Sequence, residues 1–158
     1  MRARLLASAL VAGLVLAVAL WMGRELPPVP VGVLHSFRGD LAGGEGPVAM
    51  ATFFAINELN KAGGVLGRQI VGKRGDGASD DARFESEARR LLDEEGAVAL
   101  FGCWTSSSRR TVDPILRERG ALLYYPVFYE GLEESPNIVY LGASAAQPAR
   151  RRLRQRSF

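Results

Sequence analysis

The feature that most constrains the fold is an alternation of short apolar runs with longer segments of helical periodicity. Residues 97–102 are all apolar or glycine, which is typical of a central strand covered on both faces of its sheet. The flanking segments 82–94 and 109–119 repeat apolar residues at helical spacing. Because such alternation builds βαβ units, the sequence predicts an α/β fold with an open, mainly parallel sheet and flanking helices.

Four further strands and one further helix complete the predicted domain. The strands are expected at 31–34, 69–71, 121–125 and 138–141, and the helix at 48–62. Together these elements predict a five-stranded sheet with helices between most of its strands.

Turn and capping residues support the helix boundaries. Gly63 and Gly64 favour an end to the first helix, because glycine readily takes the left-handed conformation found there. Asp80 precedes the second helix and is expected to accept a hydrogen bond from a first-turn amide. The apolar residues at helical spacing are Met50, Phe53, Phe54, Ile56 and Leu59 in the first helix, Phe84, Ala88, Leu91 and Leu92 in the second, and Val112, Ile115 and Leu116 in the third.

Residues 1–22 have the layout of an export signal. Arg2 and Arg4 precede an apolar run at 5–22, and Ala-Val-Ala at 17–19 offers a signal peptidase site. The run is also long enough, at about 18 residues, to remain as a membrane anchor. We therefore expect a periplasmic protein with either a cleaved signal peptide or a retained anchor.

Composition changes twice outside the predicted domain. Residues 23–30 form a Pro-rich linker, and residues 31–145 form the domain. The segment 146–158 holds five arginines, and without them the formal net charge of +3 becomes −2. Since the domain itself is not basic, its charge does not predict nucleic-acid binding.

The few reactive side chains do not predict catalysis. Cys103 is the only cysteine, which excludes an intramolecular disulfide, and His35 is the only histidine. A cysteine that closes an apolar strand is typically a small buried hydrophobe, so we expect no Cys–His nucleophile. A single histidine without spaced partners does not form a zinc site. We predict a structural role for His35, no enzymatic activity, no metal and no cofactor.

The loop after residues 97–102 is the first candidate ligand site. In parallel sheets, ligands bind beyond the carboxyl ends of the strands, and Trp104, Thr105 and Ser106 lie there, directly before a helix. An indole, hydroxyl groups and free helix amides suit a small, polar, neutral ligand. The same residues allow a plain alternative, in which a hydroxyl caps the helix and the indole packs.

The loop after residues 121–125 is the second candidate. It contains Tyr125, Tyr129 and Glu130, whose oxygens can accept hydrogen bonds from amide N–H groups. The alternative is that these aromatic rings belong to the core and its rim.

Seven short motifs occur in a fixed order along the chain. The motifs are VGVLHS at 31–36, NELNKAGGVLG at 57–67, DGASD at 76–80, FGCWTS at 101–106, YP at 125–126, YEGLE at 129–133 and SPNIVY at 135–140. In this order they resemble the urea- and short-chain-amide-binding branch of the type I periplasmic solute-binding proteins, a class of ABC transporter substrate-binding proteins that includes branched-chain amino acid receptors.

The resemblance implies two α/β lobes that close on a urea or amide ligand and deliver it to an inner-membrane ABC permease. Val127 and Phe128 would shape the pocket. The residues assigned to ligand binding are Trp104, Thr105, Ser106, Tyr125 and Glu130.

Two consequences of the resemblance remain expectations. Members of the family are more than twice as long as this chain, so its Arg-rich ending resembles a truncated or frameshifted copy that lacks the second lobe. Related domains also serve as sensors, so the alternative function is the ligand-sensing domain of a membrane-anchored receptor such as a histidine kinase. A retained leader favours the sensor, whereas cleavage favours the importer.

Overall fold

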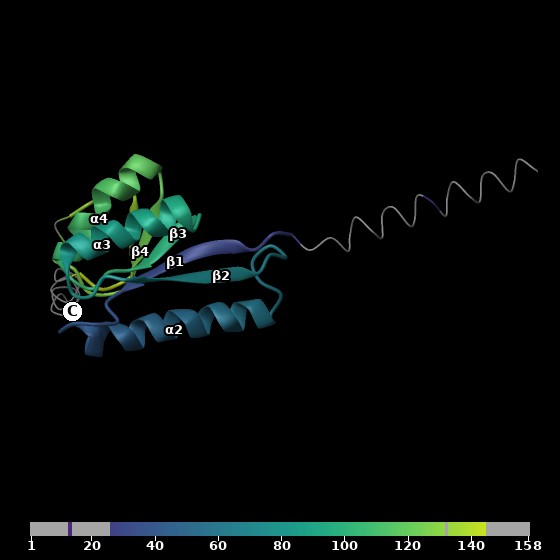
Figure 1. Cartoon of the computed structure of the whole chain (residues 1–158), viewed down its shortest axis with the longest axis horizontal. Helices are drawn as coiled ribbons and strands as arrows, with labels where there is room; N and C mark the ends of the chain where they lie inside the picture. Colours follow the sequence, from purple (N-terminus) through teal and green to yellow (C-terminus); the bar gives the residue numbers. More distant parts are fainter. Residues whose placement is uncertain (1–12, 14–25, 132, 145–158) are drawn as a thin grey trace, which may run out of the picture.

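A computed structural model of the chain (Figure 1) describes residues 13, 26–131 and 133–144. Apart from residue 13, the predicted leader lies outside the described residues, and so do residues 23–25 of the linker and the whole Arg-rich segment. Within the described ranges, no helix combines the length and the apolar character needed to cross a membrane.

The elements follow one another as strand–helix units. The strands are β1 (Val29–His35), β2 (Ile70–Asp76), β3 (Ala99–Gly102), β4 (Leu122–Tyr125) and β5 (Ile138–Tyr140). The helices are α2 (Ala42–Lys61), α3 (Asp81–Arg89) and α4 (Ser106–Arg119), and α3 continues into a π-helical turn, η1 (Arg90–Glu94).

All five strands are parallel and lie in the order β2-β1-β3-β4-β5. Gly32 of β1 is in register with Leu100 of β3, and Leu100 with Leu123 of β4. The predicted open parallel sheet is therefore confirmed, and β3 is its central strand.

The helices divide between the two faces of the sheet, with α3 and α4 on one face and α2 on the other (Figure 1). The main core lies under α3 and α4, where Phe84, Ala88 and Leu91 meet Val112, Ile115 and Leu116. These residues belong to the predicted stripes of the second and third helices, which are confirmed.

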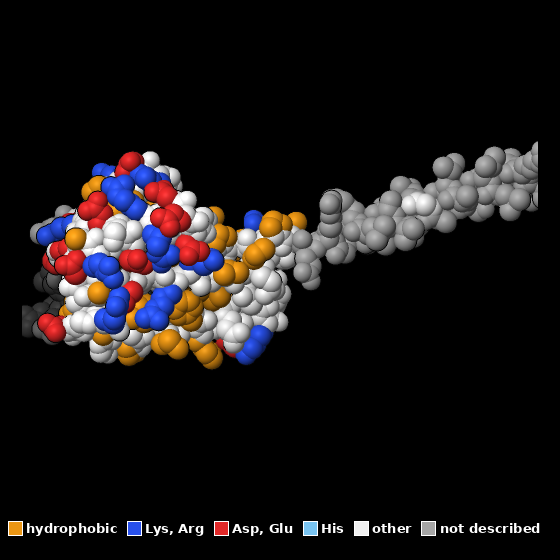
Figure 2. Space-filling model, in the orientation of Figure 1, with side chains coloured by type: hydrophobic (Ala, Val, Ile, Leu, Met, Phe, Trp, Pro, Cys, Tyr) orange, Lys and Arg blue, Asp and Glu red, His pale blue; other side chains and the backbone are white. Residues whose placement is uncertain are grey.

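The face that carries α2 is less covered. Helix α2 packs on β1 and β2, whereas Phe101 of β3 and Tyr124 of β4 stack with their ring centroids 4.8 Å apart and remain partly exposed. The prediction that the central strand is covered on both faces is therefore wrong for its α2 side. Figure 2 shows hydrophobic side chains along the lower edge of the molecule, where α2 lies in Figure 1.

Three predicted boundaries were wrong by three residues or more. The strand expected at 69–71 continues to Asp76 as β2. Helix α2 begins at Ala42, six residues before the expected start, and passes through Gly43, Gly44 and Gly46. The first turn forms there because Glu45 accepts a buried hydrogen bond from the Ser36 amide. The pattern of apolar residues does not predict this long-range contact. Helix α4 begins at Ser106 because Thr105 caps it, accepting a hydrogen bond from the Ser108 amide at 3.0 Å.

Other boundaries agree with the sequence. Asp80 accepts a hydrogen bond from the Arg83 amide at 2.8 Å, so the predicted cap is confirmed. Helix α2 ends before Gly63, whose φ of 101° lies in the region that glycine favours.

Candidate functional site

The carboxyl ends of β1, β3 and β4 meet at one edge of the sheet, and a tight backbone contact fixes the turn there. A Cβ atom on Gly102 would lie 1.9 Å from the Leu34 carbonyl oxygen, so only glycine fits between β3 and β1. The amide of Cys103 donates to the same oxygen at 2.9 Å, and Cys103 takes a φ of 60°. This turn directs the following Trp104 out of the sheet.

The thiol of Cys103 is unsuited to nucleophilic chemistry. Its side chain is fully buried in the core beneath α4. Burial raises the pKa of Cys103 to about 12, which keeps the thiol neutral. The prediction that Cys103 is a small buried hydrophobe is confirmed.

Beside Trp104 lies a hollow of about 420 Å³, hereafter the Trp104 hollow. The loop after β4 supplies its second wall, and α2 and the segment after β5 complete it. Its lining contains no charged side chain: the residues are Val48, Trp104, Pro126, Val127, Phe128 and Gly142. The pocket-shaping residues of the family resemblance, Val127 and Phe128, thus line the same hollow as the indole.

The predicted hydroxyl and carboxylate lie next to each other. The Ser106 hydroxyl donates to Oε1 of Glu130, and Oε2 of Glu130 accepts from Arg109 Nη2 at 3.2 Å. The Ser106 hydrogen bond and the Arg109 guanidinium lower the pKa of Glu130 to about 2. Glu130 is therefore a carboxylate at neutral pH and presents only acceptor atoms.

Thr105 and Tyr125 have structural roles in this geometry. The Thr105 hydroxyl caps α4, which is the plain alternative that its sequence position allowed. Tyr125 is fully buried, and its hydroxyl donates to the Trp104 carbonyl at 2.8 Å. Both side chains hold the loop that carries Trp104, and a direct contact of either with a ligand stays a prediction.

Arg109 is a residue that the sequence reasoning missed. Its side chain is fully buried, with the guanidinium 4.7 Å from the Tyr125 ring centroid and 5.7 Å from that of Tyr140. It joins Glu130 to Glu133, and so fixes the loop after β4 to α4. Arg109 follows the predicted Trp104 loop in the sequence, but nothing in the sequence spacing predicts that it pairs with Glu130 and Glu133.

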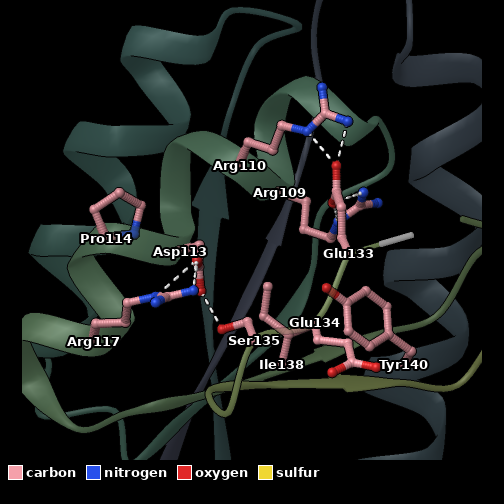
Figure 3. Close-up of a pocket in the computed structure, with 10 residues that line it drawn as sticks. All are labelled: Arg109, Arg110, Asp113, Pro114, Arg117, Glu133, Glu134, Ser135, Ile138 and Tyr140. Carbon is pink, nitrogen blue, oxygen red and sulfur yellow. Dashed lines mark hydrogen bonds and ion pairs between the residues drawn. The ribbon is translucent and has the colours of Figure 1, made fainter. Parts of the chain in front are cut away.

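A second cavity of about 380 Å³ lies between α4 and the chain leading into β5 (Figure 3). Its charged groups are largely paired with each other: Arg110 pairs with Glu133, and Arg117 lies 2.8 Å from Asp113. None of the predicted ligand-binding residues lines this cavity. The sequence-predicted site and this cavity are therefore different places.

His35 has the structural position that its sequence context predicts. It is fully buried, and its Nδ1 lies 3.2 Å from Oε2 of Glu45 in the first turn of α2. In the part of the chain that the structure describes, no group of three or more His, Cys, Asp or Glu residues is arranged to hold a metal ion.

Comparison with known proteins places this geometry in a family. A model of the periplasmic binding protein domain matches residues 29–153. A Leu/Ile/Val-binding protein homolog 8 of Brucella abortus is 38% identical over 82 residues, covering 52% of this chain and 20% of the relative. Homolog 7 of Brucella melitensis is 36% identical over 97 residues, or 61% and 24% of the two chains. The chain thus spans about a fifth to a quarter of the length of these relatives.

Solved structures show the same fold. The branched-chain amino acid transporter substrate-binding protein LivJ of Streptococcus pneumoniae, in complex with isoleucine, superposes with a TM-score of 0.64 at 25% identity, over 66% of this chain and 30% of that one. An ABC-type branched-chain amino acid transporter protein of Rhodopseudomonas palustris gives 0.64 at 18% identity, over 77% and 34% of the two chains. The match of the domain model, which covers more than half of the chain, shows that this chain belongs to the periplasmic binding protein domain family.

Proposed function

We propose that the Trp104 hollow binds urea or a short-chain amide, and that the chain is the ligand-binding part of a periplasmic component of an ABC importer. The uncharged lining of the hollow carries this proposal. An indole face and apolar walls can cover a flat, neutral ligand, while a few polar groups at the rim orient it.

We assign the polar rim to Ser106 and Glu130, which lie two residues after Trp104 and Phe128 in the chain but do not themselves line the hollow. An amide ligand offers N–H donors to the Glu130 carboxylate and a carbonyl to the Ser106 hydroxyl or to the amides at the start of α4. In the structure these two side chains hydrogen-bond to each other. Ligand binding would replace this hydrogen bond with hydrogen bonds to the ligand. Such an exchange leaves no buried polar group without a partner.

A free amino acid fits this hollow less well. Its ammonium and carboxylate groups would each need a charged or strongly polar partner, because an unpaired charge is costly to remove from water. The lining of the hollow contains no charged side chain, and Arg109 is already paired with Glu130 and Glu133, so it is not free to pair with the ligand's carboxylate. The named relatives concern leucine, isoleucine and valine, so isoleucine is the ligand to test against the proposal.

The importer is favoured over a signalling receptor by the kind of protein the chain resembles. The solved structures include substrate-binding proteins of amino acid transporters. We propose as well that the chain is exported to the periplasm and that it delivers its ligand to a permease for transport.

Saturation-transfer NMR tests the ligand directly. We expect magnetisation to pass from the protein to the acetamide methyl group, urea to displace acetamide, and the isoleucine methyl groups to receive none. Affinity should be weak, about millimolar, because a hollow on the surface of the described residues buries only part of a ligand. Transfer to isoleucine alone would overturn the proposal.

Two neighbouring serines provide a matched pair of variants. Ser106→Ala removes the rim hydroxyl, whereas Ser107→Ala removes an exposed hydroxyl that bonds to Asp81. We expect the first variant to weaken acetamide binding by about fivefold to tenfold and the second to leave it unchanged. Equal effects of the two would remove Ser106 from the site.

A further inference from the structure

The indole of Trp104 lies against the first turn of α2. A Cβ atom placed on Gly44 would be 3.4 Å from Trp104 Cζ2, so the bare backbone of this residue faces the ring. Val48 stands one turn further along α2 and lines the Trp104 hollow with the indole. One face of α2 thus lies against the ring at Gly44 and forms a wall of the hollow at Val48.

This turn is firmly held from inside the protein. Oε2 of Glu45 accepts a hydrogen bond from the Ser36 amide at 2.8 Å and lies 3.2 Å from His35 Nδ1. Glu45, His35 and Ser36 are all fully buried, which is rare for a glutamate. From the loop before the helix, the Leu41 amide donates to Ser79 Oγ at 3.0 Å. Because Glu45 fixes the turn to the end of β1, the turn cannot move aside when a side chain is added to its outer face.

We propose that Gly44 is a specificity-determining residue, which sets the position of the Trp104 indole and so the room left for the ligand. This inference rests on the proposed function of the Trp104 hollow. The absence of a side chain at position 44 lets the ring lie against the helix, and a large side chain there would drive the ring from its place. The ligand class that follows is a small, flat amide, because the ring and Val48 define adjoining walls.

The neighbouring glycine supplies a control. An added Cβ on Gly43 meets no atom within 4 Å, although Gly43 lies in the same turn of the same helix. Gly44→Leu and Gly43→Leu therefore change helix propensity alike, and only the first reaches the indole. Gly44→Ala is the intermediate step, since its methyl group fits against the ring at ordinary contact distance.

The indole Nε1–H signal reports the ring position without any ligand. The chain has two tryptophans, and Trp21→Phe in every variant leaves Trp104 as the only indole. We expect Gly44→Leu to shift this NMR signal and to weaken acetamide binding about tenfold. Gly43→Leu and Gly44→Ala should both stay close to the parent protein. An unshifted signal in Gly44→Leu would overturn the inference.

A double variant decides the matter if Gly44→Leu does not fold. Trp104→Ala removes the ring, so Gly44→Leu combined with Trp104→Ala should fold if the indole is the obstacle. A double variant that also fails to fold would place the obstacle elsewhere and contradict the inference. The indole signal is measured without ligand and the acetamide signal with it. A wrong role for Gly44 would leave the indole signal unshifted in Gly44→Leu, whereas a wrong ligand would leave acetamide unbound by the parent protein.

Discussion

The two faces of the sheet differ in how completely they are packed. Under α3 and α4, Leu91 and Leu116 are wholly inaccessible to solvent. On the opposite side, Met50 and Phe54 of α2 remain 63% and 66% exposed. Charged side chains cover the outer surface of the first face, whereas hydrophobic ones gather at the second (Figure 2). Helical periodicity therefore identifies a helix, but it does not show how much of the apolar surface is covered.

A matched pair of leucines tests this difference most strongly. Leu116 of α4 has no exposed surface, whereas Leu59 of α2 is 47% exposed. We expect Leu116→Ala to lower the free energy of unfolding by about 2–5 kcal/mol, because it leaves a cavity in a packed core. Leu59→Ala should cost less than about 1 kcal/mol. Unfolding in guanidinium chloride measures both without adding urea, the proposed ligand, and equal losses would show that the faces are alike.

The turn at the end of β3 gives the next largest effect. Gly102→Ala places a methyl group against the Leu34 carbonyl, so β1 and β3 must separate. We expect a loss of about 2–3 kcal/mol in the free energy of unfolding and a shifted Trp104 indole signal. Gly43→Ala serves as the control, because it adds a methyl group in open space. A Gly102→Ala protein as stable as its parent would contradict the close contact.

Acid should act on the loop after β4 and less on the packed face. The pKa of Glu130 falls from its ordinary 4.5 to about 2, so its stabilising contacts are complete above pH 4.5 and are lost as the pH falls towards 2. Thermal unfolding between these pH values should therefore show a smaller decline for Glu130→Gln than for the parent. Glu134→Gln, at an exposed position in the same loop, is the control. Identical declines in all three proteins would show that the contacts of Glu130 do not stabilise the loop after β4.

The smallest effect on stability is expected at the exposed face of α2. Phe54→Ser removes an apolar ring that is mostly in solvent, so the free energy of unfolding should change by less than about 0.5 kcal/mol. Binding of a hydrophobic dye and self-association in sedimentation should nevertheless decrease. Phe54→Leu keeps the apolar surface and should behave like the parent. A large loss of stability in Phe54→Ser would mean that the ring is packed.

The sequence was sufficient for the parallel sheet and for the two helices of the packed face. Their stripes are regular, and Asp80 caps α3 through a local contact that spacing reveals. It was insufficient where long-range polar contacts decide the structure. The early start of α2 depends on Glu45 meeting Ser36, and the loop after β4 is held by Arg109. Both contacts join residues that come together only in the folded protein.

The candidate site was predicted as a place more accurately than as a set of contacts. The edge that carries Trp104 follows from the parallel sheet, because the carboxyl ends of its strands meet there. That Ser106 bonds to Glu130 while the Tyr125 hydroxyl is used by a backbone carbonyl follows only from the fold. Residue type identifies what a side chain can bind, and tertiary structure decides what is left free.

The most direct test of the central claim is a map of backbone amide shifts by ¹H–¹⁵N NMR as acetamide is added. Binding at the Trp104 hollow predicts shifts concentrated at residues 103–106, 126–131 and 142, with little change along α3. Isoleucine at the same concentration should leave these signals in place. Shifts produced by isoleucine alone, or acetamide shifts centred on the cavity beside Asp113 and Arg117, would contradict a neutral amide site at this edge of the sheet.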